Sequence, residues 1–344
     1  MSNKNIDWAS LGFAYTQTDC HIQYVWKDGK WDEGRLVESP YIPIHIAAGG
    51  LHYGQECFEG MKVFRQKNGA VSIFRVRDNA RRMFNTAERL CMATVPEDMF
   101  VDAVARVVKA NLDYVPPYGT GGSLYIRPLL FGSGPQIGVA PAPEYTFIVL
   151  VTPVGAYYKG GLQPVKAIVI DHYDRAAPLG TGHVKCGGNY AASLYAHLEA
   201  KAKGYPVELY LDAKTHTYIE EFSTSNFLGI TKDGKYVTPD SHSVLPSVTN
   251  MTLCQLAADM GMPVERRPID FEKEIDSFAE VAACGTAVVV TPVCSIERNG
   301  VIHKTGPETG CGPTLEKLYH AVQDIQYGVA PDVHGWNTVI VPAP

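Results

Sequence analysis

The amino-acid sequence predicts a mixed α+β protein built from two domains. The chain has 344 residues, and at about 150 residues per domain this length favours two of them. Segments with alternating apolar residues, typical of strands, are interspersed with segments in which apolar residues recur at helical spacing. Residues 153–164 (PVGAYYKGGLQP) are rich in proline and glycine and lack both periodicities, which indicates an interdomain linker.

The composition is that of an ordinary globular protein, with 46% hydrophobic and 19% charged residues. Acidic residues (36) exceed basic ones (30), and the net charge of −6 disfavours nucleic acid or anionic lipid as the main partner. The sequence has no uninterrupted apolar run of about 18 residues, and its first residues lack the apolar core of a secretory signal. We therefore expect no membrane partner and no targeting segment.

The eight cysteines are scattered along the chain. They form no C-x-x-C pair and no Cys/His cluster at zinc spacing. We expect reduced thiols, a cytoplasmic location and no metal site.

The smaller N-terminal domain is assigned to residues 1–155. Residues 19–33 alternate around Asp28 and Gly29, a turn pair that favours a hairpin. Asp78 is the expected N-cap of the first helix. The other expected strands cover residues 70–76, 123–132 and 144–154, and the expected helices cover residues 79–90 and 97–115.

The linker is placed at residues 156–164 and the larger C-terminal domain at residues 165–344. Gly261 is the expected left-handed cap at the end of one helix of this domain. Its expected strands cover residues 165–170 and 287–293, and its expected hairpins cover residues 208–222 and 226–239. Its expected helices cover residues 189–204, 249–260 and 314–326.

The segment most informative about function is GTGHVKCGGNYAAS, residues 180–193, in which Lys185 is enclosed by glycines and small residues just before a helix. A lysine that forms an imine needs a desolvated setting that makes its neutral amine accessible. Glycines also let a flat cofactor approach the backbone. A solvated loop lysine is the other interpretation of the same pattern, and the segment alone leaves both open.

Three further segments and Arg82 bear on this choice. Glu221 is suited to face a heterocyclic nitrogen, whereas Glu220 is assigned to a solvated strand edge. Residues 246–249 (PSVT) start a helix, and its first N–H groups either bind an anion or are simply capped by a side chain. Arg82 either supplies a guanidinium that binds phosphate or is a surface arginine. Residues 285–287 (GTA) provide a close backbone approach and one hydroxyl, or a tight turn.

Taken together, the chain resembles the branched-chain amino-acid aminotransferases, which belong to the fold type IV class of pyridoxal-phosphate enzymes. The resemblance spans most of the chain and preserves the order of the family's motifs. It implies the mixed α+β fold of that class, with two domains and the active site between them. The motifs are HYGQECFEGMKVF, ARRM, LYIRPLLFG, VGAYY, HVKCGGNY, EEFSTSN, LPSVT and CGTA.

The resemblance also implies roles for individual residues. Lys185 matches the Schiff-base lysine, Tyr190 the partner of the cofactor's phenolic oxygen, and Glu221 the partner of the pyridine nitrogen. The residues matching the family's phosphate-binding groups are Arg82, Val248, Thr249 and Thr286. Those matching its substrate pocket are Tyr53, Phe58, Tyr125, Arg127 and Tyr157, with Thr224 and Ala287 near the substrate carboxylate.

The activity implied is reversible transfer of the amino group from leucine, isoleucine or valine to 2-oxoglutarate, giving branched-chain 2-oxo acids and glutamate, as in amino-acid biosynthesis. Lys185 would act as general base and acid, and the family implies a homodimer. The chain departs from the family at Asn250, where many relatives have arginine, and at Val288 and Thr291, where some carry a redox C-x-x-C.

Two other functions stay open. A different fold type IV enzyme, such as a D-amino-acid aminotransferase or aminodeoxychorismate lyase, would share Lys185 and Glu221 but lack the Y-x-R-P and HYGQECFEGMK segments. A protein that binds pyridoxal phosphate or another metabolite without catalysis is the second.

Overall fold

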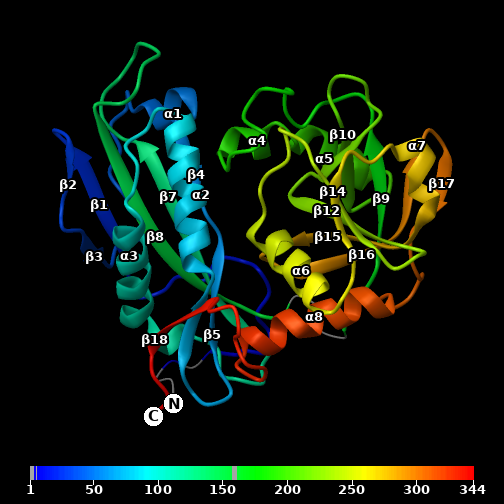
Figure 1. Cartoon of the computed structure of the whole chain (residues 1–344). Coiled ribbons are helices and arrows are strands. Elements are labelled where there is room, and N and C mark those ends of the chain that lie inside the picture. Colours follow the sequence, from blue (N-terminus) through cyan, green and yellow to red (C-terminus); the bar gives the residue numbers. More distant parts are fainter. Residues whose placement is uncertain (1–3, 5, 157–160) are drawn as a thin grey trace. The chain divides into compact units, whose positions relative to one another are not determined.

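The computed structural model describes residues 4, 6–156 and 161–344, which form two compact units (Figure 1). The first unit comprises Met1–Tyr157, Lys185–Gly187 and Asp324–Pro344. The second comprises Tyr158–Val184 and Gly188–Gln323. This division differs from the expected one, because Lys185–Gly187 and the last residues of the chain make their contacts within the first unit. The linker at 156–164 stays a prediction, since residues 157–160 lie outside the described residues.

The first unit is built on a nine-stranded sheet, in the order β18-β6-β5-β7-β8-β1-β2, with β3 added to β1 and β4 to β7. The longest pair is β7 with β8, antiparallel along ten residue pairs from Ser123↔Val154 to Gly132↔Tyr145. The strands are β1 (His21–Lys27), β2 (Lys30–Trp31), β3 (Arg35–Val37), β4 (Glu56–Phe58), β5 (Met61–Arg65), β6 (Val71–Phe74), β7 (Ser123–Gly132), β8 (Glu144–Val154) and β18 (Asn337–Val341).

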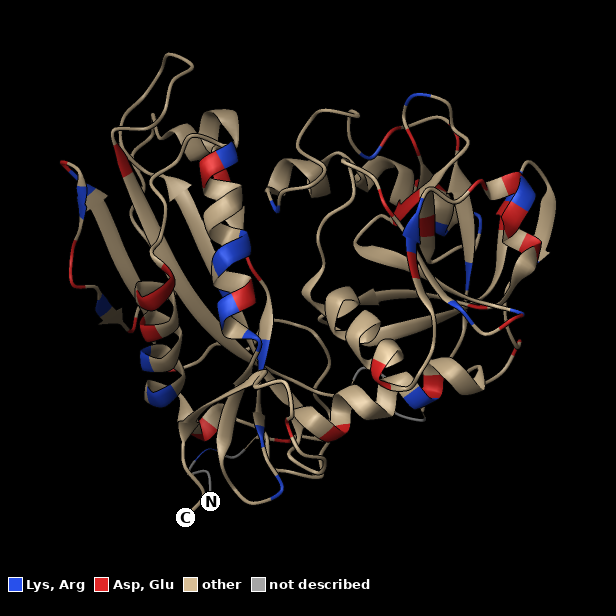
Figure 2. Ribbon diagram, in the orientation of Figure 1, with Lys and Arg blue, Asp and Glu red and all other residues tan. Residues whose placement is uncertain are grey.

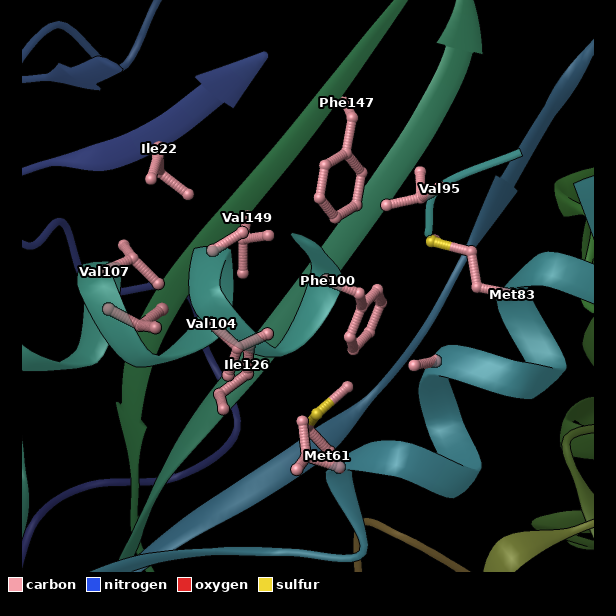
Figure 3. Close-up of a cluster of buried hydrophobic side chains, with 14 of the residues drawn as sticks. Ile22, Met61, Met83, Val95, Phe100, Val104, Val107, Ile126, Phe147 and Val149 are labelled. Atoms are coloured by element: carbon pink, nitrogen blue, oxygen red, sulfur yellow. The ribbon is translucent and has the colours of Figure 1, made fainter. Parts of the chain in front are cut away.

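Two helices supply the core of this unit, α2 (Val76–Arg89) and α3 (Glu97–Ala110). Met83 of α2 and Phe100 of α3 are fully buried against strand residues such as Ile126 and Phe147 (Figure 3). Burying an aliphatic or aromatic side chain contributes about 1.5–3 kcal/mol. This cluster therefore fixes α2, which carries Arg82. The short helix α1 (Gly49–Tyr53) and the 3-10 helix η1 (Leu112–Tyr114) complete the unit.

The hairpin at Asp28 and Gly29 is confirmed, and both residues have positive φ as the turn requires. The strand ends at 123–132 and 144–154 are confirmed as well. The cap at Asp78 is wrong: α2 starts at Val76, with Arg75 as N-cap. Val76 is fully buried, and Asp78 instead pairs with Arg75 Nε at 2.7 Å.

The second unit holds a nine-stranded sheet that closes on itself, because β11 pairs with both β10 and β12. The order is β11-β10-β9-β16-β15-β12-β13-β14, with β17 added to β16. The strands are β9 (Val165–Ile170), β10 (Val207–Leu211), β11 (Ile219–Phe222), β12 (Ser225–Thr231), β13 (Tyr236–Pro239), β14 (Val264–Arg267), β15 (Phe278–Gly285), β16 (Val289–Arg298) and β17 (Val301–Lys304).

One predicted helix of this region, 189–204, is wrong in extent. The chain forms α4 (Gly187–Ala191) and then α5 (Leu194–Ala202), and the helix is interrupted at Ala192 and Ser193. The Ser193 hydroxyl donates to Tyr190 O at 2.9 Å, a local bond that competes with helix continuation. The remaining helices are α6 (Val248–Asp259), α7 (Phe271–Glu274), η2 (Ile275–Ser277) and α8 (Pro313–Gln326), and Gly261 has the expected positive φ after α6.

Basic residues (lysine, arginine) and acidic residues (aspartate, glutamate) are distributed over both units, and α2 and α3 each carry both signs (Figure 2). The eight cysteines are free thiols. Within the described ranges, no helix combines the length and apolar character needed to cross a membrane, and no cluster of His, Cys, Asp or Glu could hold a metal ion.

Candidate active site

The backbone around Lys185 is held by strand β4 and helix α2 of the first unit. Phe58 N donates to Lys185 O at 3.1 Å, and Lys185 N donates to the Thr86 hydroxyl at 3.1 Å. Gly187 N donates to a carboxylate oxygen of Glu56. The Lys185 side chain extends to Phe58, with Nζ 4.8 Å from the ring centroid. Lys185 is thus a half-buried loop residue with an anchored backbone, which argues against the solvated loop interpretation.

A second cation lies against the same ring. The Arg127 guanidinium is 4.8 Å from the Phe58 centroid and donates through Nη2 to the Tyr125 hydroxyl at 3.0 Å. Residues two apart on a strand share a face, as expected for Tyr125 and Arg127 on β7. The structure therefore brings Lys185, Phe58, Arg127 and Tyr125 together.

The expected substrate pocket also includes Tyr53 and Tyr157, and the structure describes only the first of these two residues. Tyr53 ends α1, is 47% exposed, and donates from its hydroxyl to Ile137 O. Tyr157 lies outside the described residues.

Arg82 forms a buried, two-bonded ion pair with Glu59. Nε and Nη2 donate to the two carboxylate oxygens, each at 2.7 Å. Glu59 is fully buried and the Arg82 side chain is 11% exposed, so the surface arginine interpretation is wrong. Glu59 was not anticipated; its signal is an acidic residue in a mostly apolar segment, CFEGM.

Lys62 is another residue that sequence reasoning missed. It lies on β5 directly across from Tyr125 of β7. Burial lowers the pKa of Lys62 to about 8. An amine with a lowered pKa therefore stands on the strand next to the one that carries Tyr125 and Arg127.

In the second unit, Glu221 is buried and paired with Arg175, whose Nη2 lies 2.8 Å from Oε1. Asn226 Nδ2 donates to Glu221 Oε2 at 2.5 Å, and Leu245 N donates to Oε1 at 3.2 Å. Asn226 stands directly across from Glu221 in the β11–β12 pair. Arg175 was not anticipated, because its partner is 46 residues away and no local pattern joins them.

The prediction that Glu220 is a solvated residue at a strand edge is wrong. It is 3% exposed and accepts hydrogen bonds from the Ser241 hydroxyl at 2.8 Å and from the Ser243 hydroxyl. The closed sheet explains the error, since β11 has a partner strand on each side.

Helix α6 begins at Val248 and Thr249, and Ser247 is its N-cap, accepting from Asn250 N at 3.2 Å. The first N–H groups of a helix have no partner within it and form an anion-binding end. Asn250 is buried and bonds Tyr236 and Thr238 of β13, so it anchors this end of α6.

The remaining expected residues of this unit lie in turns or beside the lysine loop. Thr224 occupies the β11–β12 turn, and Thr286 and Ala287 occupy the β15–β16 turn. Because Asn226 pairs with Cys284, these turns meet at one end of the sheet. Tyr190 belongs to α4, next to Asn189, whose buried amide donates to Thr181 O and Val184 O.

Known proteins are similar to this chain in both sequence and fold. The family model described as Amino-transferase class IV matches residues 56–296. A branched-chain-amino-acid aminotransferase of Haemophilus influenzae is 49% identical over 339 residues, covering 97% of this chain and 98% of that protein. One of Helicobacter pylori is 44% identical over 335 residues, covering 97% of each.

Among solved structures, the branched-chain amino acid aminotransferase of Escherichia coli superposes with a TM-score of 0.77 and 27% identity. The match covers 93% of this chain and 99% of that one. The predicted resemblance and the fold type IV class are thereby confirmed. The chain belongs to the class IV aminotransferase family and is an enzyme of its branched-chain-amino-acid aminotransferase group.

Proposed function

We propose that this enzyme uses pyridoxal 5'-phosphate to transfer the amino group of leucine, isoleucine or valine to 2-oxoglutarate. The observation that carries the proposal is Lys185, anchored through its backbone and lying against the Phe58 ring, which Arg127 also contacts, in a chain of this family. A lysine so fixed can present one nitrogen repeatedly to the same reacting atoms.

The side chains present fit this cofactor. When bound, pyridoxal phosphate supplies an aldehyde that accepts the amino group and a ring that stabilises negative charge at the substrate α-carbon. Lys185 would hold the aldehyde end, and Tyr190 the phenolic oxygen. Buried Glu221 would accept from the ring nitrogen, and the adjacent Asn226 Oδ1, a buried acceptor without a partner in the described chain, marks a place for a donor.

The phosphate would be held by Arg82, by the N–H groups of Val248 and Thr249 at the start of α6, and by the Thr286 hydroxyl. Arg82 keeps its orientation through Glu59. A guanidinium and a helix N-terminus are both suited to a dianion.

Lys185 would also move the proton. Its amine takes the proton from the substrate α-carbon and returns one to the cofactor side, acting as general base and then acid. Phe58, next to Nζ, limits the water around the amine. This supports the role that the family resemblance assigns to Lys185.

The pocket must accept an aliphatic side chain and also the second carboxylate of glutamate. We assign the aliphatic group to Phe58, Tyr53 and Tyr157. Arg127 and the Tyr125 hydroxyl would bind the carboxylate, since Arg127 Nε is buried without a partner among the described residues and an anion would satisfy it. Thr224 and Ala287 are assigned to the α-carboxylate.

Visible absorption of the purified enzyme tests the proposal. Addition of leucine should shift the cofactor absorption, and 2-oxoglutarate should restore it. Lys185→Ala should abolish turnover, with the folded structure retained by circular dichroism. A bound cofactor whose spectrum neither substrate changes would refute the transamination, and D-alanine acting in place of leucine would favour the D-amino-acid enzyme.

A homodimer and a cytoplasmic location stay predictions. Sedimentation of the purified chain tests the first, and cell fractionation the second.

A further inference from the structure

The Thr86 hydroxyl lies between the two residues to which the proposed function gives the cofactor's opposite ends. Thr86 is on α2, one turn after Arg82, and is 1% exposed. Its Oγ1 donates to Arg82 O at 2.9 Å and accepts from Lys185 N at 3.1 Å. One buried hydroxyl thus joins the backbone of α2 to that of Lys185, 99 residues along the chain.

The two bonds reinforce one another. A threonine hydroxyl has one hydrogen and two acceptor lone pairs. The hydrogen is committed to Arg82 O, as is common for threonine four residues after a helical carbonyl. The lone pairs are then directed away from that carbonyl and are available to the Lys185 N–H, and each bond polarises the other.

Two neighbouring contacts complete the arrangement. Phe58 N donates to Lys185 O, and Gly187 N donates to the Glu56 carboxylate. A Cβ on Gly187 would meet that carboxylate, so a larger residue there would push the Glu56 side chain away from this close approach. The N–H and the C=O of Lys185 therefore each have a partner, and the Thr86 bond comes from a side chain of the arginine-bearing helix.

We propose that Thr86 is a positioning residue: it sets the distance and direction of Lys185 relative to α2, and thereby to Arg82. This inference rests on the proposed function. Thr86 touches no reacting atom, and it acts through the lysine backbone. Losing it should slow the steps that need a placed Lys185 amine and leave leucine affinity unchanged.

Thr86→Val removes the hydroxyl at nearly constant volume, and Thr86→Ser keeps it. Thr305→Val is the matched control, because Thr305 is fully buried and its hydroxyl donates to Val293 O at 2.7 Å, far from Lys185 in the sequence and outside the proposed site. For each protein we would measure kcat and KM for leucine, the melting temperature, and, after removal of the cofactor, the rate at which added pyridoxal phosphate becomes borohydride-fixed on the Lys185 peptide.

Thr86→Val should lower kcat and the fixation rate about tenfold, which corresponds to about 1.4 kcal/mol. KM for leucine should change less than twofold, and Thr86→Ser should recover most of both rates. Thr305→Val should lower the melting temperature comparably and leave both rates unchanged. Rates for Thr86→Val within twofold of wild type, with a lower melting temperature, would show that Thr86 is merely structural and overturn the proposal.

A wild-type measurement covers the case in which Thr86→Val does not fold. The Lys185 amide of the cofactor-free enzyme should exchange with D₂O at least tenfold more slowly than in the unfolded chain, and unprotected exchange would refute the bond. Failure of the proposed function looks different: the wild type itself would then neither transaminate leucine nor fix pyridoxal phosphate on Lys185.

Discussion

The buried pair of Arg82 and Glu59 allows a stability prediction with a definite size. Glu59→Gln keeps the side-chain volume and removes the charge, so the largely buried Arg82 faces a neutral amide in place of the Glu59 carboxylate. Removing one partner of a buried ion pair costs about 3–5 kcal/mol. Because the Arg82 side chain retains some solvent access, we take the lower end, about 3 kcal/mol. At about 2–4 °C per kcal/mol for a unit of this size, the melting temperature should fall by about 6–12 °C.

The assay is urea and thermal unfolding of the cofactor-free enzyme, with Glu97→Gln as control. Glu97 also pairs with arginines, Arg77 at 2.7 Å and Arg81 at 3.0 Å, but these side chains are 52% and 61% exposed. Such pairs contribute about 0–1 kcal/mol. The double variant Glu59→Gln, Arg82→Gln should lose less than the sum of its single variants. Equal losses for Glu59→Gln and Glu97→Gln would refute the assignment of a buried, coupled pair.

Three further predictions concern catalysis and pH. Glu221→Gln should lower kcat about 100-fold, or about 2.7 kcal/mol, because a neutral amide cannot stabilise a protonated ring nitrogen; stopped-flow absorption with leucine measures this, and a loss under threefold would contradict it. Arg127→Met should raise the KM for 2-oxoglutarate about 30-fold, or about 2 kcal/mol for a bond to a charged group, with the KM for leucine as internal control; equal changes in both would contradict the assignment. Burial raises the pKa of Glu56 above its ordinary value of about 4.5, so the folded state binds this proton more tightly than the unfolded chain does. The stability of wild type relative to Glu56→Gln should therefore decline as pH rises from about 4.5. Urea unfolding across pH 4–8 checks this, and a constant difference between the two proteins would refute it.

Local patterns predicted most elements of the fold. The hairpin at Asp28 and Gly29 follows from a turn that needs positive φ, and the strands 123–132 and 144–154 follow from uninterrupted β-forming segments. The pairing of strands that are distant in sequence could not be predicted, because no local sequence pattern identifies the partner strand. β18 pairs with β6 across more than 260 residues, and nothing in NTVIV specifies that partner.

The candidate site divides in the same way. Lys185, Arg82 and Glu221 were predicted from their local sequence setting and from the family resemblance. Their counter-charges were not, because Glu59 lies apart from Arg82 and Arg175 apart from Glu221 in sequence, and no local pattern joins either pair. Burial of a charge demands a counter-charge, but the demand does not specify where in the chain it lies. Glu220 illustrates the same limit, since two serines on a later loop satisfy it.

The pairing of β18 with β6 bears on the order of events during synthesis. The first unit takes a strand from each end of the chain, whereas the second unit is encoded between them. On the ribosome, the closed sheet of the second unit has all its strands before residues 337–341 emerge. Until then β6 presents an open edge of Val71–Phe74, a template for pairing with other chains. A nascent chain that stalls just short of β18 is therefore the form of this protein most exposed to aggregation and most in need of a chaperone.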